Sequence, residues 1–134
     1  MASGKGNTLS NAILDHVLGG GDYARLATVY IALFTTAPTA AGGGVEVSGT
    51  GYARVAVTNN NTNFPAASNQ QKKNGTAIDF GTAGSNWGTI VAAAVMSAAN
   101  GGDILYWGTL AANKTVNSGD GFRINANNLT LTEA

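Results

Sequence analysis

The sequence has no cysteine, and only two of its 134 residues are proline. Without cysteine the chain can form neither a disulfide framework nor a thiolate metal site, so its fold must rest on packing and backbone hydrogen bonds. Charge is also scarce, because Asp, Glu, Lys and Arg make up 10% of the residues, against about 25% in ordinary soluble domains. A surface so poor in charge often lies against other protein.

The charges that are present cancel, with seven basic and seven acidic residues. A neutral chain offers no electrostatic footprint for a nucleic-acid backbone or an anionic membrane surface, so we expect neither as a partner. The longest apolar run, residues 89–99, is about half of the ~20 residues needed to cross a bilayer. The polar start of the chain lacks the apolar segment of a secretory signal, which predicts synthesis in the cytoplasm.

Catalytic groups are almost absent. The carboxylates are scattered singly along the chain, so no pair is set up for acid–base catalysis. The single histidine, His16, follows Asp15 on a predicted helix and has no second ligand or nucleophile nearby in sequence. The glycine clusters at residues 19–21 and 42–44 lack the lysine and hydroxyl residue of a phosphate-binding loop, and we interpret them as turns. We therefore expect no enzyme, no metal and no cofactor.

What the chain does contain is a series of short β-rich runs, beginning with residues 28–58, which alternate strand, loop, short strand, glycine turn and strand. Residues 29–34 are apolar on both faces, which predicts a central strand covered on both sides. Further strands are predicted at residues 45–47, 52–58, 76–80, 88–96 and 104–110, then a short strand just before a turn at residues 117–121, and closing strands at 122–124 and 129–132. This pattern predicts an all-β fold, an antiparallel β-sandwich or barrel of about eight or nine short strands with one N-terminal helix.

At this length one domain is expected, with a polar N-terminal arm at residues 1–7 and a single β-rich domain at residues 8–134. Thr8 is placed to cap a helix. Five apolar residues share one face of this helix: Leu9, Ile13, Leu14, Val17 and Leu18. Such a face predicts a lid over the domain's own core, and docking into a neighbouring subunit is the alternative.

Polar, glycine-rich segments supply the candidate contacts with other proteins. The loop at residues 59–75 is long for a structureless connection, which favours a functional or mobile segment. Exposed backbone in this loop, in residues 40–44 and in the arm is free to pair with a neighbour. The candidate assembly contacts are Lys5, Asn7, Gly43, Phe64, Lys72 and Lys73.

Four aromatic residues suggest a different kind of surface. Stacking on sugar rings is one use of such side chains, and the candidates are Tyr52, Trp87, Tyr106 and Trp107. The alternative is that the two indoles fill sheet corners, since each precedes a glycine at or inside an apolar strand.

Several segments in order carry a family resemblance: LSNAILDHVLGG at residues 9–20, YIALFTTAPTAAGGGVEVSGTGYARVAVT at 30–58, FPAASNQQKKNGTAIDFGTA at 64–83, WGTI at 87–90 and ILYWGTLAANKTVNSGDGFRINANNLTLT at 104–132. Together they resemble a family of small structural proteins of tailed bacteriophages, often labelled tail-fibre or virion structural proteins. The chain departs from the family's pattern at residues 91–99, where an aromatic residue and an aspartate are common. The resemblance implies a non-enzymatic β-domain, made in the host cytoplasm and assembled in many copies on the virion.

The leading functional hypothesis is a capsid decoration or cement protein, because the compact length lacks a repeating fibre shaft. A tail or fibre-base protein is the next alternative, and a receptor- or glycan-binding module at the virion surface is the third. The partners implied are other virion proteins, either the major capsid protein or tail components, and further copies of the same chain.

Overall fold

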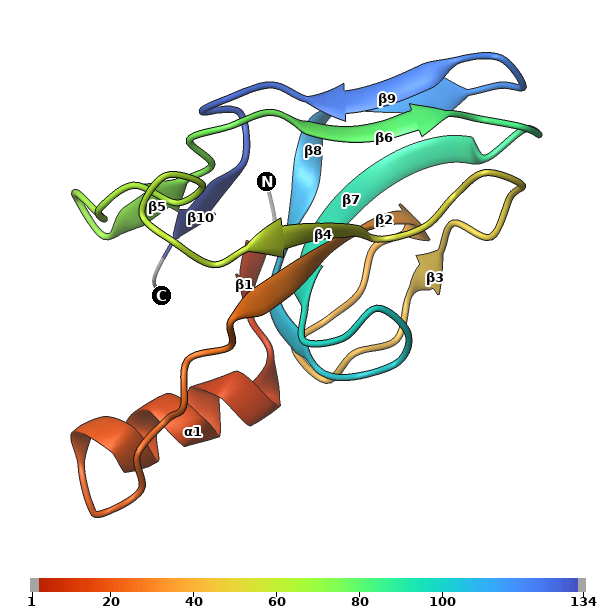
Figure 1. Ribbon diagram of the computed structural model, residues 1–134. Helices are drawn as coiled ribbons and strands as arrows, with labels where there is room; N and C mark the ends of the chain where they lie inside the picture. Colours follow the sequence, from red (N-terminus) through yellow and green to blue (C-terminus); the bar gives the residue numbers. More distant parts are fainter. Residues whose placement is uncertain (1–2, 133–134) are drawn as a thin grey trace.

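A computed structural model describes residues 3–132, which fold into one helix and ten strands (Figure 1). In chain order the elements are β1 Ser3–Lys5, α1 Asn7–Val17, β2 Thr28–Thr36, β3 Val45–Glu46, β4 Val55–Thr58, β5 Gln71–Lys73, β6 Ile78–Thr82, β7 Gly88–Met96, β8 Ile104–Val116, β9 Gly121–Ile124 and β10 Thr130–Thr132.

The strands form one large sheet and two small ones. The large sheet has six strands in the order β1-β8-β7-β2-β3, and β4 also pairs with β2. The small sheets are β10-β5 and β6-β9, and every pairing among residues 3–132 is antiparallel. Figure 1 shows β6 and β9 lying across one end of the large sheet, with β5 and β10 beside them. The prediction of an all-β antiparallel sandwich with one N-terminal helix is confirmed.

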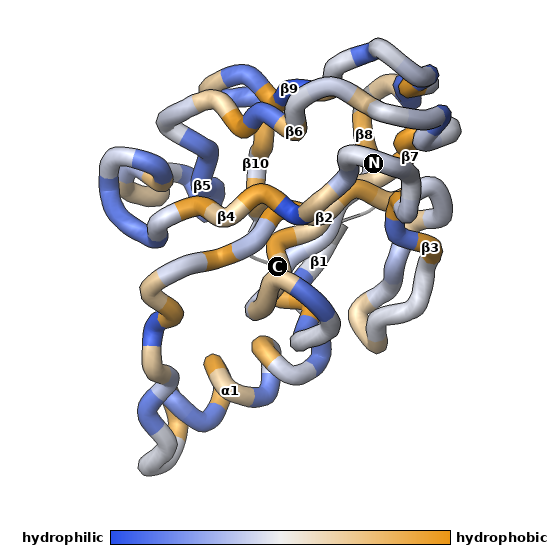
Figure 2. Tube along the Cα trace, turned by 45° about the vertical axis from the view of Figure 1, so that its right-hand side comes forward, coloured by the Kyte–Doolittle hydropathy of each residue, from blue (hydrophilic) through white to orange (hydrophobic). Residues whose placement is uncertain are grey.

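Strand β2 lies inside the large sheet and is covered on both faces, as its sequence predicts. Ile31 and Leu33 are fully buried in the larger core cluster, together with side chains of the small sheets. Ala32 and Phe34 point the other way into a second cluster with alanines of β7 and Ile104. Apolar residues at consecutive positions therefore serve two cores. In Figure 2 the apolar positions follow the strands of the body, while the loop beside β5 is mostly polar.

Most predicted strands are found with bounds that differ by up to three residues, as in β4, which begins at Val55 instead of residue 52, and three larger differences stand out. β7 has the predicted bounds, but β8 runs unbroken to Val116, where a strand that ends at residue 110 and a separate short strand are predicted; its pairing with β7 has an irregularity between Ile90 and Ala92. Strands β1 and β5 were not predicted, since each is a short polar segment whose partner lies far along the chain. Part of the predicted N-terminal arm is thus the edge strand β1, and its first two residues lie outside the described residues.

The helix begins at Asn7 with Gly6 as its N-cap, and no side chain caps it, so the prediction of a Thr8 cap was wrong. Gly6 occupies this position because the chain passes close to β8: its N–H donates to the carbonyl of Leu105 at 2.9 Å. A Cβ at Gly6 would overlap the carbonyl oxygen of Ile104. The junction between β1 and α1 is therefore in direct contact with β8.

The helix covers the core only with its first half. Leu9 is buried and Ile13 packs against the larger core cluster, whereas Leu14, Val17 and Leu18 are 58%, 68% and 74% exposed. Figure 1 shows α1 projecting away from the sheets. The prediction of a lid over the domain's own core holds for Leu9 and Ile13 and was wrong for the other three residues.

Candidate assembly surface

The most prominent surface feature is the apolar side of α1 that its own domain leaves open. Four large apolar side chains are exposed among residues 3–132, and three of them are Leu14, Val17 and Leu18. Leu14 and Val17 are three residues apart on the helix, and Leu18 follows them directly as its extended C-cap residue. We refer to these three residues as the α1 face. Exposed apolar side chains gathered in this way are typical of a site that contacts another molecule.

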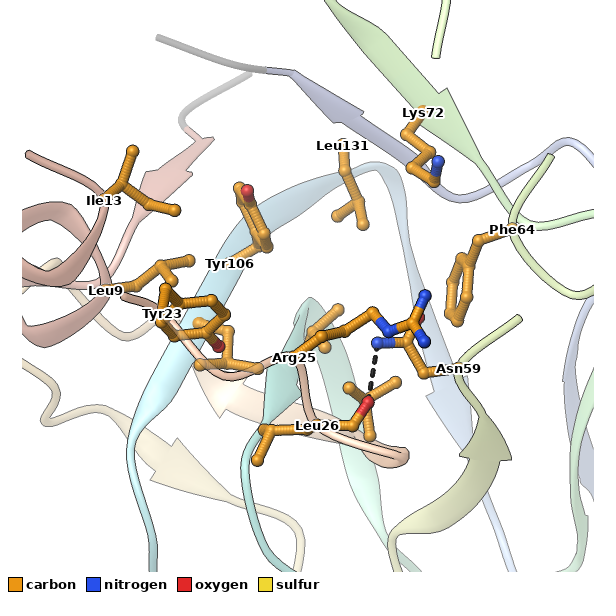
Figure 3. A pocket seen from close by; sticks show the side chains of 13 residues that line it. Leu9, Ile13, Tyr23, Arg25, Leu26, Asn59, Phe64, Lys72, Tyr106 and Leu131 are labelled. Atoms are coloured by element: carbon orange, nitrogen blue, oxygen red, sulfur yellow. Dashed lines mark hydrogen bonds between the residues drawn. The ribbon is translucent and has the colours of Figure 1, made fainter. Parts of the chain in front are cut away.

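Beneath the helix lies an apolar cavity of about 180 Å³ (Figure 3). Leu9 and Ile13 line it from α1, while Tyr106 of β8 and Leu131 of β10 line it from the sheets. Figure 3 shows Phe64, Asn59 and Lys72 at the opposite end from the helix. The side-chain amide of Asn59 donates to the carbonyl oxygen of Leu26 at 2.8 Å and so holds the start of β2 in place.

Two further hollows continue this cavity across the surface. Their volumes are about 310 Å³ and 400 Å³, and both share Tyr106 and Leu131 with the cavity beneath α1. We refer to these three adjoining spaces, which have Tyr106 and Leu131 in their common walls, as the Tyr106 groove. Arg25 and Lys72 line it, and no carboxylate lines it among the residues that the structure describes. The groove is thus apolar with a positive character.

A second, more polar feature ties β3 to the segment that leads into β4. Arg54 donates from Nε and Nη2 to the two carboxylate oxygens of Glu46 at 2.9 and 2.8 Å, and its Nη1 donates to the carbonyls of Ala98 and Gly101. The hydroxyl of Tyr52 donates to Glu46 at 2.6 Å and accepts from the N–H of Leu33 at 3.0 Å. Every polar group of the network has a structural partner, so we interpret it as a brace for the loop between β7 and β8.

The pKa values in this network follow from burial and from these bonds. Burial raises the pKa of Glu46, but the hydrogen bonds from Arg54 and Tyr52 outweigh it, so the pKa lies below its ordinary 4.5. Burial raises the pKa of Tyr52 well above its ordinary 10, and the hydrogen bond to Glu46 raises it further. The bond to Glu46 likewise raises the pKa of Arg54. The carboxylate and the guanidinium therefore stay charged and the phenol stays neutral near neutral pH.

Asn74 is another structural polar residue, and the sequence analysis did not single it out. It is 1% exposed. Its amide nitrogen donates to the carbonyls of Thr76 and Asn125, and its side-chain oxygen accepts from the N–H of Leu129. One asparagine thereby fastens the end of the 59–75 loop to the segment before β10.

Of the six predicted assembly contacts, the structure places Lys72 in the Tyr106 groove. Phe64 is 5% exposed and belongs to the core, so its choice as a surface contact was wrong: the loop uses its one large apolar side chain to anchor itself. Lys73 lies outside the groove beside the 65–71 loop. Asn7 and Gly43 are exposed and Lys5 is half-buried on β1. Within the predicted set, Lys72 and the buried Phe64 both line the Tyr106 groove.

The four aromatic residues do not form one stacking surface. Trp87 is 4% exposed, and its indole N–H donates to the carbonyl of Thr50 at 3.0 Å. Tyr52 stacks on Phe80 and meets Trp87 edge to face, so both Tyr52 and Trp87 are engaged in packing. Tyr106 faces the Tyr106 groove, while Trp107 packs against the second core cluster on the other side of the sheet. The proposed stacking role was wrong for Trp87, because its ring is covered.

The sequence analysis missed Arg25, Tyr106 as a groove residue, and Leu131. Arg25 follows a glycine linker in a segment without periodicity, and Leu131 alternates with threonines in a short strand. Within residues 3–132, no three His, Cys, Asp or Glu side chains lie close enough together to hold a metal ion. The same range contains no helix with the length and apolar character required to span a membrane.

The sandwich, the uncovered α1 face and the Tyr106 groove define a small β-structural domain whose distinctive surfaces suit contacts with protein. A sequence model of the family described as Podophage GP4 fiber I protein gp80 matches residues 4–132. The chain belongs to this family, which confirms the resemblance to phage tail-fibre and virion structural proteins. A comparison with curated proteins finds no match.

Proposed function

We propose that this protein is a non-enzymatic structural component of the fibre or tail apparatus of a tailed phage. The observation that carries the proposal is the family match, which spans nearly the whole chain and has a fibre protein as its description. The exposed α1 face supports it, because a domain that leaves three large apolar side chains open has a surface suited to a protein partner.

This proposal reverses the order of the first two functional hypotheses. The compact length favoured capsid decoration, since a fibre that reaches a receptor normally has a long repeating shaft. A small domain can also serve as a base or a joint of a fibre, and that role needs no shaft. The family description favours the fibre or tail location over capsid decoration.

The polar network also supports a role without catalysis. Glu46, Tyr52 and Arg54 are the described groups with a shifted pKa, and all three point at one another or at backbone carbonyls. No group of this network is left free to act on a substrate among the residues described. We therefore propose no reaction and no cofactor for this chain.

Location on the particle tests the proposal. A small tag placed in the exposed turn around Gly119, where a side chain would meet nothing within 4 Å, is labelled with gold on purified virions and imaged by cryo-electron microscopy. Label confined to the tail or to fibres is the expected result. Label spread over the capsid would favour decoration, and absence of the protein from purified virions would overturn a virion role altogether.

A further inference from the structure

The α1 face lacks a partner within its own domain, and its surroundings are acidic. Asp15 and Asp22 are both exposed near it, and the segment from Asn7 to Asp22 contains no lysine or arginine; its one other titratable side chain is His16, whose Nδ1 lies 3.9 Å from Asp22. The projecting end is also the C-terminal end of the helix, which carries the negative part of the helix dipole. This end of the molecule therefore offers apolar side chains with negative charge around them.

The Tyr106 groove has the opposite character. Its floor is apolar, with Leu9 and Ile13 at one end and Tyr106 and Leu131 along its length, and Arg25 and Lys72 supply positive charge. Its adjoining spaces of about 180, 310 and 400 Å³ leave room for several side chains. A helix face with aliphatic side chains and neighbouring carboxylates fits such a groove, because its apolar groups meet the apolar floor and its carboxylates meet the positive charges.

We propose that the α1 face of one copy docks into the Tyr106 groove of a second copy of this chain. Leu14 and Leu18 enter the apolar part of the groove, and Asp15 and Asp22 lie near Arg25 and Lys72 of the receiving copy. Both halves of the contact are present on every chain, and the two surfaces are complementary in charge. A copy cannot satisfy its own groove in this way, because its α1 projects away from the sheets (Figure 1).

The contact joins two different surfaces, so it is head-to-tail. A copy that receives one α1 still presents its own, and such contacts close into a ring or continue as a filament according to the rotation between neighbours. This inference does not depend on the location proposed above, since it concerns the purified chain alone. Self-association of the purified chain and its location on the tail are therefore tested separately, and either result can fail without the other.

Sedimentation velocity of the purified full chain over a range of concentrations gives the first test. We expect reversible association that weakens as salt is added, because part of the attraction is between charges. A wild-type protein that remains monomeric up to about 1 mM, where an interaction of ~4 kcal/mol would be visible, overturns the proposal.

Two variants then separate the halves of the contact. The first, Leu14→Ser with Leu18→Ser, removes two of the three side chains of the α1 face but keeps the groove; the second, Arg25→Glu with Lys72→Glu, reverses the groove charge but keeps the α1 face. Each alone should weaken association by about tenfold or more. A 1:1 mixture of the two variants should form a heterodimer, because the intact groove of the first variant then meets the intact α1 face of the second.

Matched controls exclude general effects. Val45→Ser removes the remaining exposed large apolar side chain, which lies on β3, and Lys73→Glu with Arg123→Glu changes the net charge by the same amount outside the groove. Both should associate like the wild type. Association that survives in the two test variants, or that is lost in the controls to the same degree, overturns the proposal. Association lost in each variant without recovery in the mixture overturns the head-to-tail arrangement.

Discussion

Arg54 donates two parallel hydrogen bonds to Glu46, from Nε to Oε2 at 2.9 Å and from Nη2 to Oε1 at 2.8 Å. The third nitrogen of the same guanidinium reaches the carbonyls of Ala98 and Gly101 at 2.7 and 2.8 Å. A planar fork of donors is what allows one side chain to hold a carboxylate and two carbonyls together. The pair thus joins β3, the chain before β4 and the turn between β7 and β8.

Arg54→Met should lower the free energy of unfolding by about 2–3 kcal/mol, because Glu46 loses its charged partner while it stays largely covered. Urea denaturation followed by tryptophan fluorescence measures the change. Arg123→Met is the matched control, since Arg123 is exposed on β9, and it should change stability by less than about 0.5 kcal/mol. Equal losses in the two variants would show that the Arg54 fork contributes nothing specific.

Acid should remove the contribution of the Glu46 carboxylate. Its pKa in the folded state lies below its ordinary 4.5, so folding favours the ionised form. The stabilisation is complete above pH 4.5 and is lost as the pH falls through the lower pKa of the folded state. Stability measured from about pH 7 to about pH 3 should fall less steeply in Glu46→Gln than in the wild type. Parallel pH profiles would contradict the shift.

Tyr52→Phe should cost about 1–3 kcal/mol, because it leaves the N–H of the fully buried Leu33 without its acceptor and takes a donor from Glu46. The raised pKa of Tyr52 makes a second, spectroscopic prediction. Folding favours the neutral phenol, so this stabilisation is present below pH 10 and is lost as the pH rises above it. In the absorbance titration of the tyrosines, the rise that occurs at the highest pH should be missing from the variant. An unchanged titration would show that another group ionises there.

The fold class followed from the sequence because its signal is local. Alternation and two-sided apolar runs mark β2 and β7 without knowledge of their partners. Strand β5, in contrast, is the polar segment Gln71–Lys73, and only its pairing with β10, more than fifty residues further on, makes it a strand. Amphipathic spacing identified α1, but it could not show that the domain has room for only Leu9 and Ile13 beneath the helix.

The candidate site was less predictable than the fold for the same reason. Lys72 was chosen as one of two lysines in a polar loop, and the pattern alone could not distinguish it from Lys73; the antiparallel register of β5 and β10 places Lys72 opposite Leu131 in the groove. Trp87 and Tyr106 were both candidates for a stacking surface, with packing at a sheet corner as the alternative for Trp87. Burial separated them, and burial depends on the packing of strands that are remote in sequence.

Asn74→Ala should destabilise the protein by about 2–3 kcal/mol. The change leaves the carbonyl of Asn125 and the N–H of Leu129 without the side-chain partners that they have at 3.0 and 2.9 Å. Asn61→Ala, at an exposed asparagine of the same loop, is the control and should be near neutral. Hydrogen exchange adds a local readout: the amide of Leu129 should lose protection in Asn74→Ala while amides of β2 and β7 keep theirs. Uniform loss of protection would indicate global destabilisation only.

Gly6→Ala tests whether the seating of α1 depends on the absence of a side chain at one position. The φ of Gly6 is −69°, which any residue can adopt, so strain in the backbone is not the issue. The obstacle is space, because a Cβ would meet the carbonyl oxygen and side chain of Ile104 on β8. Relief requires the chain to move away from β8, which breaks the bond from Gly6 N–H to Leu105 and exposes Leu9. We expect a loss of about 3 kcal/mol, measured by thermal and urea unfolding. Gly20→Ala is the matched control, since a Cβ there meets nothing within 4 Å. If Gly6→Ala were as stable as Gly20→Ala, the close contact between the β1–α1 junction and β8 would not hold in solution.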